Sequence, residues 1–213
     1  MKILDLFAGK GGEIRRPIIE ALGHEYTTLD IDASFNCDTT ADIMTIDDLG
    51  LYDFVWASVP CEKFSVSSIG VYWNKDHTPK TDEFGFITEN GLEAVEAMKL
   101  VQHTIDLLQV TAKIGWVIEN PRGKLRKMPF MQDIPRSTVT YCRYGMDVMK
   151  PTDIWHVGLN WTPRPMCHNG NPDHIAAPRG SRTGTQGNKT YADKSIVPIE
   201  LWLEILAALA DEA

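Results

Sequence analysis

The chain has 213 residues, a formal net charge of −8 and four scattered cysteines, at positions 37, 61, 142 and 167. This length is enough to bury one full core, so we expect a single domain over residues 1–213. No apolar run reaches the roughly 18 residues of a membrane span, and residues 1–6 are too short and too soon acidic for a secretion signal. The cysteines are not typical of a disulfide framework, which favours a reducing, cytoplasmic setting.

Strands and helices are expected to alternate along the chain. Residues 2–7 predict a short buried strand that ends in a glycine-rich turn, and residues 14–22 predict a helix with Pro17 in its first turn. Further strands are expected at 26–32, 53–58, 115–118, 137–144 and 154–157, and further helices at 92–108 and 198–209. This alternation predicts an α/β fold with a Rossmann-like, doubly wound, mostly parallel sheet.

Two long stretches lack periodicity, residues 62–91 and residues 160–189, and loops of this length are usually functional or disordered. The charge is also uneven. Residues 113–189 hold 12 Lys or Arg and 5 Asp or Glu, whereas residues 1–112 hold 8 and 19. An acidic body with a basic segment indicates either a local anionic partner or a solvated basic surface, and charge alone leaves both open.

The glycine-rich turn Gly9-Lys10-Gly11-Gly12 follows the first strand and opens the first helix. A strand, a glycine turn and a helix N-terminus are typical of a nucleotide-type site, because the backbone can approach the ligand. The turn is not a P-loop. Asp30 lies about 20 residues further on, where a ribose-binding acid is expected, and Asp32 competes for that role. The alternative is a tight turn with acidic strand ends.

Two more polar features follow buried strands. Pro60-Cys61 ends the strand at 53–58, and Glu119-Asn120-Pro121 ends the strand at 115–118. Open α/β sheets bind ligands at the carboxyl ends of their strands, so these residues are candidates for an active site. A free thiol titrates near ~8.5 and needs activation to act as a nucleophile. The alternatives are a small buried apolar cysteine and a strand-end acid that caps a turn.

In this order the chain resembles the DNA (cytosine-5) methyltransferases. Residues 5–12 (DLFAGKGG), 60–65 (PCEKFS) and 119–121 (ENP) are similar to the family's cofactor, nucleophile and glutamate motifs. Residues 191–198 (YADKSIVP) look like its last motif, which returns to the cofactor pocket. The match is tight from residue 3 to about 122 and looser beyond. Compact, phage-type members that lack a large target-recognition domain are the most similar, since they also carry segments like 129–131 and 150–155.

The resemblance implies the class I S-adenosylmethionine-dependent methyltransferase fold, with S-adenosyl-L-methionine as cofactor. By the same resemblance Phe7 and the glycines line the cofactor pocket, Asp30 binds the ribose and Asp42 meets the adenine amine. The full set of implied cofactor contacts is Asp5, Phe7, Ala8, Gly9, Gly11, Asp30, Ile31, Asp42, Pro60 and Ser195.

The implied reaction is methyl transfer to C5 of cytosine in DNA. The Cys61 thiolate attacks C6, and Glu119 holds N3 and the exocyclic amine. A cytosine in double-stranded DNA must be flipped out to reach such a pocket. Residues 62–91 would then close over it, with Gly70, Gly85 and Gly91 as hinges and Phe64 and Trp73 as packing or stacking groups. The expected substrate contacts are Asn120, Pro121, Arg122, Lys150, Arg179 and Arg182.

The chain departs from the family in two places. The usual Gln-x-Arg-x-Arg motif is absent from residues 144–155, where Lys150 is expected to supply a positive charge, with Arg122 or Arg143 as another source. Only residues 160–189 stand where the family inserts its target-recognition domain, and Arg164, Arg179, Arg182 and Lys189 there would contact phosphate without reading sequence. The basic segment 122–127 would join them. We therefore expect low or short sequence specificity, or a partner or oligomer that supplies it.

Three rival functions stay open: methylation of an exocyclic amine of cytosine or adenine, a catalytically idle DNA- or cofactor-binding module, and action on RNA or a modified pyrimidine. Cys142, Cys167, His168 and His174 fit no regular zinc-ligand spacing, so no metal is expected. The expected location is the cytoplasm of a bacterial or phage-infected cell.

Overall fold

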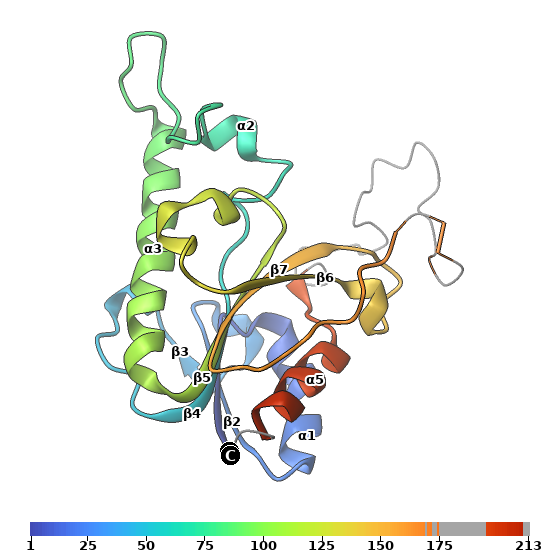
Figure 1. The fold of residues 1–213 in the computed structure, drawn as a ribbon. Helices are drawn as coiled ribbons and strands as arrows, with labels where there is room; N and C mark the ends of the chain where they lie inside the picture. The colour runs from blue at the N-terminus through green and yellow to red at the C-terminus, as the bar shows by residue number, and fades with distance from the viewer. Residues whose placement is uncertain (169, 172–173, 175–194, 211–213) are drawn as a thin grey trace.

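The computed structural model describes residues 1–168, 170–171, 174 and 195–210. At its centre is a seven-stranded sheet with the order β3-β2-β1-β4-β5-β7-β6 (Figure 1). Its strands are β1 (Lys2–Leu6), β2 (Glu25–Asp30), β3 (Thr39–Thr40), β4 (Tyr52–Ser58), β5 (Ala112–Pro121), β6 (Arg136–Thr140) and β7 (Pro151–Val157). The first five are parallel, and β7 runs antiparallel between β5 and β6. The predicted doubly wound, mostly parallel sheet is confirmed.

Helices cover both faces of this sheet (Figure 1). The helices are α1 (Gly9–Ala21), α2 (Ile69–Tyr72), α3 (Glu89–Thr111) and α5 (Ile199–Ala210). Short 3-10 helices are η1 (Ala33–Phe35), η2 (Ile43–Thr45), η3 (Leu125–Lys127), η4 (Pro129–Met131) and η5 (Tyr141–Tyr144). Helix α3 lies on one face, and α1 and α5 lie on the other. No helix in the described ranges is long and apolar enough to cross a membrane.

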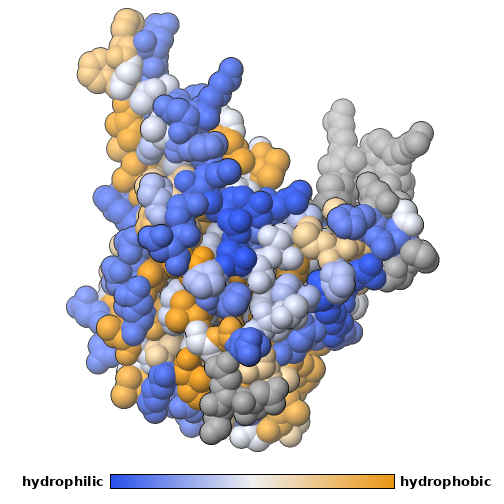
Figure 2. All heavy atoms as spheres, viewed as in Figure 1, coloured by the Kyte–Doolittle hydropathy of each residue, from blue (hydrophilic) through white to orange (hydrophobic). Residues whose placement is uncertain are grey.

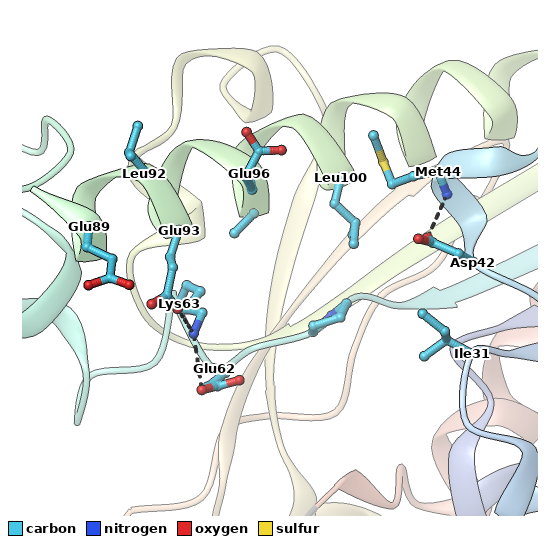
Figure 3. A pocket seen from close by; sticks show the side chains of 12 residues that line it. Ile31, Asp42, Met44, Glu62, Lys63, Glu89, Leu92, Glu93, Glu96 and Leu100 are labelled. Atoms are coloured by element: carbon cyan, nitrogen blue, oxygen red, sulfur yellow. Dashed lines mark hydrogen bonds and ion pairs between the residues drawn. The ribbon is translucent and has the colours of Figure 1, made fainter. Parts of the chain in front are cut away.

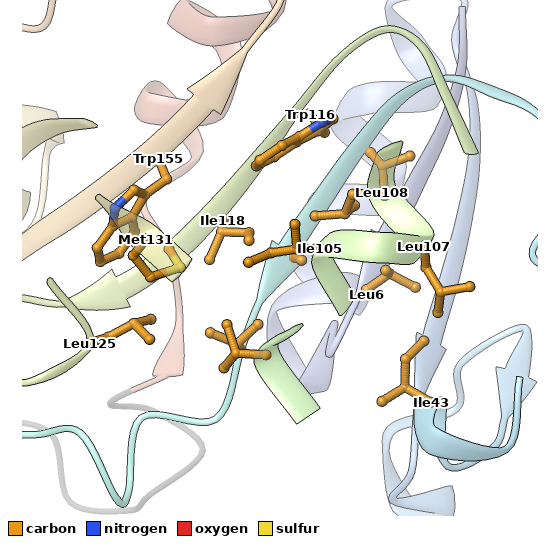
Figure 4. Packing of buried hydrophobic residues seen from close by; sticks show 14 of the residues in the cluster. Leu6, Ile43, Ile105, Leu107, Leu108, Trp116, Ile118, Leu125, Met131 and Trp155 are labelled. Atoms are coloured by element: carbon orange, nitrogen blue, oxygen red, sulfur yellow. The ribbon is translucent and has the colours of Figure 1, made fainter. Parts of the chain in front are cut away.

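Each face has its own apolar core. Under α3, Ile105 and Leu108 pack with Ile118 and Trp116 of β5 (Figure 4). On the opposite face Trp202 of α5 stacks on Trp56 of β4, with ring centroids 4.3 Å apart. Because β4 and β5 are buried on both faces, their sequences are nearly continuous apolar runs, as expected for central parallel strands. The polar residues that follow them therefore stand at the edge of a rigid, fully packed platform.

Two predicted boundaries are wrong in ways that concern the site. Helix α1 begins at Gly9, so the glycine run forms its first turn and Pro17 lies in the helix interior. The expected strand at 137–144 ends at Thr140, and Tyr141–Tyr144 forms η5 instead. Gly145, with a positive φ of +84°, ends that turn. The β-branched pattern of the preceding residues predicts a strand and gives no sign of the turn.

Residues 62–91 are more ordered than their composition suggests. They contain α2 and a hairpin-like segment with bridges between Trp73 and Pro79 and between Thr81 and Ile87. Phe64 and Trp73 are both buried, with ring centroids 5.8 Å apart, so of the two predicted roles they pack rather than stack on a base. Beyond them the apolar tip of the hairpin projects from the end of α3, where Figure 2 shows hydrophobic surface.

Candidate active site

The glycine-rich turn is joined to the end of β2 by Asp30. The Gly9 amide donates to Oδ2 of Asp30 across 2.9 Å, and the Asp32 amide donates to Oδ1 across 3.0 Å. Phe7 and Gly9 have positive φ angles of 57° and 51°, which turn the backbone sharply between β1 and α1. The Asp32 carboxylate instead accepts from the Ser34 amide and caps η1. Of the two competing acids, Asp30 is the one that lies against the glycine turn.

The segment that begins at Ser195 returns to this turn. A Cβ on Gly9 would lie 3.9 Å from Oγ of Ser195 and 3.9 Å from Oδ2 of Asp30. Ser195 directly precedes the segment leading into α5, so the position expected for the last motif is beside the first. The three residues Gly9, Asp30 and Ser195 thus surround one end of the proposed cofactor site.

Asp5 lies beneath the turn rather than at its surface. It is fully buried and accepts from Nη2 of Arg15 across 2.5 Å and from the Tyr26 hydroxyl. Burial raises the pKa of the Asp5 carboxyl even though Arg15 lowers it. A Cβ on Gly11 would come within 2.4 Å of Nη1 of Arg15, so this glycine leaves room for the buried cation. Asp5, Arg15 and Tyr26 hold the glycine turn from below.

A cavity of about 530 Å³ opens between α3 and the carboxyl ends of β2 and β4 (Figure 3). This volume lies in the range of small-molecule sites. The residues that line the cavity include predicted cofactor contacts and also residues of α3 that were not predicted from the sequence as site residues. The lining residues are Ile31, Asp42, Met44, Pro60, Glu62, Lys63, Glu89, Leu92, Glu93, Glu96, Ala97 and Leu100. Glu89, Glu93 and Glu96 recur at helical spacing on one face of α3, which is the signal that could have identified this wall.

Cys61 and Glu119 stand on neighbouring strand ends. Ser58 of β4 pairs in register with Glu119 of β5, and Cys61 follows three residues beyond Ser58. The buried Asn120 side chain donates from Nδ2 to the Val59 carbonyl across 2.9 Å. The Cys61 carbonyl accepts from the amides of Phe64 and Ser65, which closes a tight turn around the half-buried thiol. The β5 motif therefore directly braces the turn that carries Cys61.

Glu119 is buried, with 4% of its surface exposed, and it is held by residues from the last third of the sheet. The Tyr141 hydroxyl of η5 donates to Oε1 of Glu119 across 2.7 Å, and Nζ of Lys150 lies 4.0 Å from the same oxygen. Burial and the adjacent carboxylate keep the pKa of the Tyr141 hydroxyl well above its ordinary value, so it stays a donor. Lys150, which the sequence analysis expected to supply a positive charge, therefore lies beside this buried carboxyl group. Tyr141 was missed because the predicted strand ran through it.

In the basic segment 122–127 some side chains are exposed and others form contacts within the protein. Arg122 and Lys127 are exposed, whereas Lys124 is buried with its Nζ 2.6 Å from Nδ1 of His77, and Arg126 forms an ion pair with Asp153. In the same view as Figure 1, Figure 2 shows hydrophilic residues gathered across the region that follows β5. Only part of this segment is therefore available for a DNA face.

The predicted phosphate contacts after residue 160 divide in the same way. Arg164 forms ion pairs with Glu200 and Glu204 of α5, at 2.6 and 2.7 Å. Arg179, Arg182 and Lys189 lie outside the described residues.

Comparison with known proteins agrees with this architecture. No protein-family model matches the chain. A "Probable DNA (cytosine-5)-methyltransferase" of Frog virus 3 is 26% identical over 166 residues, which cover 73% of this chain and 70% of the viral protein. The solved structure of the Entamoeba histolytica methyltransferase EhMeth aligns with 80% of this chain at a TM-score of 0.51 and 12% identity. The alignment covers 57% of the Entamoeba protein, so the chain spans somewhat over half of that structure.

The alignment with EhMeth shows that this chain has the class I S-adenosylmethionine-dependent methyltransferase fold expected from its sequence. The viral relative matches this chain over nearly three quarters of its length. These findings agree with the resemblance: the chain has a methyltransferase fold, and its sequence is similar to that of the viral probable DNA (cytosine-5)-methyltransferase.

Proposed function

We propose that the protein transfers a methyl group from S-adenosyl-L-methionine to C5 of cytosine in DNA through a covalent bond to Cys61. The observation that carries this proposal is the bracing of the Cys61 turn by Asn120 next to a buried Glu119. A thiol and a buried carboxyl group at adjacent strand ends suit nucleophilic attack on a ring that must also be held at a nitrogen. The printed name of the viral relative points to the same reaction.

The residues present fit the cofactor. The left-handed backbone at Phe7 and Gly9 forms a turn that is bordered by Asp30 and Ser195, and Ile31, Asp42 and Pro60 line the cavity described above. Backbone amides and a carboxylate at this edge of a doubly wound sheet are the groups that hold a nucleoside. The three other implied contacts, Asp5, Ala8 and Gly11, are buried in or beneath the same turn. When bound there, S-adenosylmethionine supplies the electrophilic methyl group.

The chain's own residues account for the rest of the reaction. The Cys61 sulfur forms a bond to C6 of the cytosine, and the electron pair displaced from the C5–C6 double bond makes C5 nucleophilic. Glu119 shares a proton with N3, and its carboxyl group is held by the Tyr141 hydroxyl and by the nearby Lys150 ammonium group, both at Oε1. After C5 is methylated, a water molecule takes the C5 proton, the C–H electron pair restores the C5–C6 double bond, and the Cys61 thiolate leaves with the electron pair of the C–S bond. The reaction consumes no other reagent.

Substrate contacts are part of the same proposal. Pro121 is the last residue of β5 and Arg122 follows it, and Arg179 and Arg182 would meet DNA phosphates. We propose double-stranded DNA with a flipped cytosine and low or short sequence specificity, because only residues 160–189 stand in place of a recognition domain. A partner or oligomer that adds specificity, and a cytoplasmic location in a bacterial or phage-infected cell, remain predictions.

A trapping experiment tests the reaction. The protein is incubated with S-adenosylmethionine and duplex DNA that carries 5-fluorocytosine, whose fluorine cannot leave as a proton does. We expect a covalent protein–DNA complex that survives denaturation and is absent from Cys61→Ser. Cys37→Ser serves as the matched cysteine control and should still form it. Methylation of N4 or N6 without an adduct, an adduct with RNA only, or absence of cofactor binding by calorimetry would each overturn the proposal in favour of one rival.

A further inference from the structure

A second cluster of reactive side chains lies on the far side of the Tyr141 turn. Cys142 belongs to η5, and Cys167 and His174 belong to the segment after β7. One ligand atom from each of the three lies within 4.8 Å of the others. We propose that Cys142, Cys167 and His174 bind one zinc ion, a site separate from the Cys61 nucleophile and independent of the function proposed above.

The distances suit a tetrahedral ion. Sγ of Cys167 lies 3.3 Å from Nδ1 of His174. Zinc bonds of about 2.3 Å to sulfur and about 2.0–2.1 Å to nitrogen place two such ligand atoms about 3.6 Å apart in a tetrahedron. The two side chains therefore need to separate by only a few tenths of an ångström to admit the ion. Three protein ligands from the described residues leave one position for water.

The backbone around the cluster is already arranged. The Cys167 amide donates to Oγ1 of Thr140 across 2.8 Å, which fixes the cysteine against the end of β6. The His168 amide donates to Oδ1 of Asn171, and the His174 amide donates to the Asn171 carbonyl across 3.0 Å. This compact turn returns His174 to Cys167 across seven positions in the chain. Ligands held in advance by other hydrogen bonds lose little conformational freedom when the ion binds.

The donor set selects the metal. Thiolate sulfur and imidazole nitrogen suit zinc, whereas magnesium and calcium need oxygen ligands. Two thiolates also neutralise the charge of a divalent ion, so binding in this partly buried place leaves no net charge behind. Cys167 is buried, and Cys142 and His174 are half-buried. Spacing alone did not reveal the site, because the ligands come from two segments that the sheet brings together.

Such an ion would connect two parts of the molecule. It would join η5, where Tyr141 donates to Glu119, to the segment that leads into residues 175–194. Cys142 directly follows Tyr141, so the ion would restrain the turn that supports the buried carboxyl group. The site is structural in this sense, and its metal is not expected to contact the substrate.

Metal content tests the proposal first. The full chain, produced in zinc-supplemented medium and passed through a desalting column, should carry close to one zinc per chain by elemental analysis. Cys142→Ser, Cys167→Ser and His174→Gln should each weaken binding by at least the tenfold seen when a metal's outer partners are lost. The matched controls Cys37→Ser and His168→Gln should retain the wild-type metal content. Equal zinc in all five variants, or none in the wild type, overturns the proposal.

Cobalt substitution gives a readout that does not depend on variant stability. Chelator-treated wild-type protein titrated with Co²⁺ should develop thiolate-to-cobalt charge transfer and the strong visible bands of four-coordinate cobalt. Cys142→His keeps a ligand at this position, so it should still bind cobalt but with weaker charge transfer. An octahedral spectrum without charge transfer contradicts the site. Peptide mapping without reductant is a second check, on protein that was purified under reducing conditions. A disulfide between Cys142 and Cys167 in these peptides would also contradict the site.

Discussion

The side-chain amide of Asn120 reaches across from β5 to the carbonyl of Val59 at a distance of 2.9 Å. This contact fixes the backbone just before Pro60 and Cys61, and Asn120 itself is fully buried. The position of the proposed nucleophile is therefore set by a neighbouring strand and not by its own loop alone.

Asn120→Ala should lower both stability and turnover. The substitution leaves the Val59 carbonyl without its donor, and an unsatisfied buried group costs about 1–3 kcal/mol. Denaturant unfolding measures the loss, and single-turnover methylation measures the effect on Cys61. Asn90→Ala, on the exposed start of α3, is the control and should change stability by no more than about 0.5 kcal/mol. If both variants unfold at the same denaturant concentration, the contact does not brace the turn.

Asp30→Ala should weaken cofactor binding far more than Asp32→Ala. Asp30 accepts from the Gly9 amide at the glycine turn, whereas the Asp32 carboxylate caps η1 with the Ser34 amide. Losing Asp30 removes both a hydrogen bond that shapes the turn and an acceptor for the ligand. We expect a loss of at least about tenfold, which corresponds to about 1.4 kcal/mol. Calorimetric titration with S-adenosylhomocysteine measures both affinities, and a larger loss in Asp32→Ala would reverse the assignment.

Lys150→Met should slow methylation while Lys150→Arg retains most of it. The Lys150 ammonium lies 4.0 Å from Glu119, where a cation stabilises the carboxylate in the low-dielectric interior. We expect turnover to fall to about one hundredth at most, the lower range for a preorganised electrostatic group. Residue 150 has a left-handed φ of 23°. Methionine and arginine both carry a Cβ at this position, so the arginine variant controls for any effect of backbone strain. Lys127→Met, at an exposed site, should leave the rate unchanged.

Gly123→Ala should disturb the Cys61 turn from below. Its Cβ would lie 2.2 Å from the Phe64 carbonyl oxygen, a backbone atom that cannot move alone. Overpacking of this kind costs about 1–3 kcal/mol. Gly70→Ala is a matched control, because no atom lies within 4 Å of its Cβ position. Thermal unfolding should show a lower midpoint only for Gly123→Ala, and unchanged midpoints in both would refute the close approach.

Acid should destabilise the fold partly through His156. Burial lowers the pKa of this imidazole, which packs edge-on against Trp161 at 5.7 Å. The unfolded chain therefore takes up the proton first, near its ordinary pKa of about 6.5. The unfolding free energy falls as pH drops below that value and continues to fall until the folded pKa is reached. His156→Gln should reduce this slope below about pH 6.5 in denaturant titrations. If the unfolding free energies of the wild type and the variant depend on pH in the same way, His156 does not cause the loss of stability in acid.

The sequence was most informative for candidate site residues at the end of a buried strand. Asp30, Cys61 and Glu119 each lie at or near the carboxyl end of a buried strand, and parallel strands bring these ends to one edge of the sheet. Tyr141 escaped prediction because the β-branched pattern of 137–140 continues into an aromatic residue, while the turn depends on Gly145. The Asp5–Arg15 pair and the Cys142–Cys167–His174 cluster escaped for another reason. They are contacts between distant segments, and no local periodicity encodes which segments meet.

The reversed direction of β7 has a consequence for how this site can vary. A parallel strand brings its last residues to the functional edge, but an antiparallel strand brings its first, so Lys150 arrives beside Glu119 from the start of β7. Lys150 is thus attached to the turn between η5 and β7, whereas Glu119 belongs to β5 and Cys61 follows β4. A change of length in residues 145–149 would therefore move the Lys150 ammonium group relative to Glu119, while β4 and β5 keep their pairing.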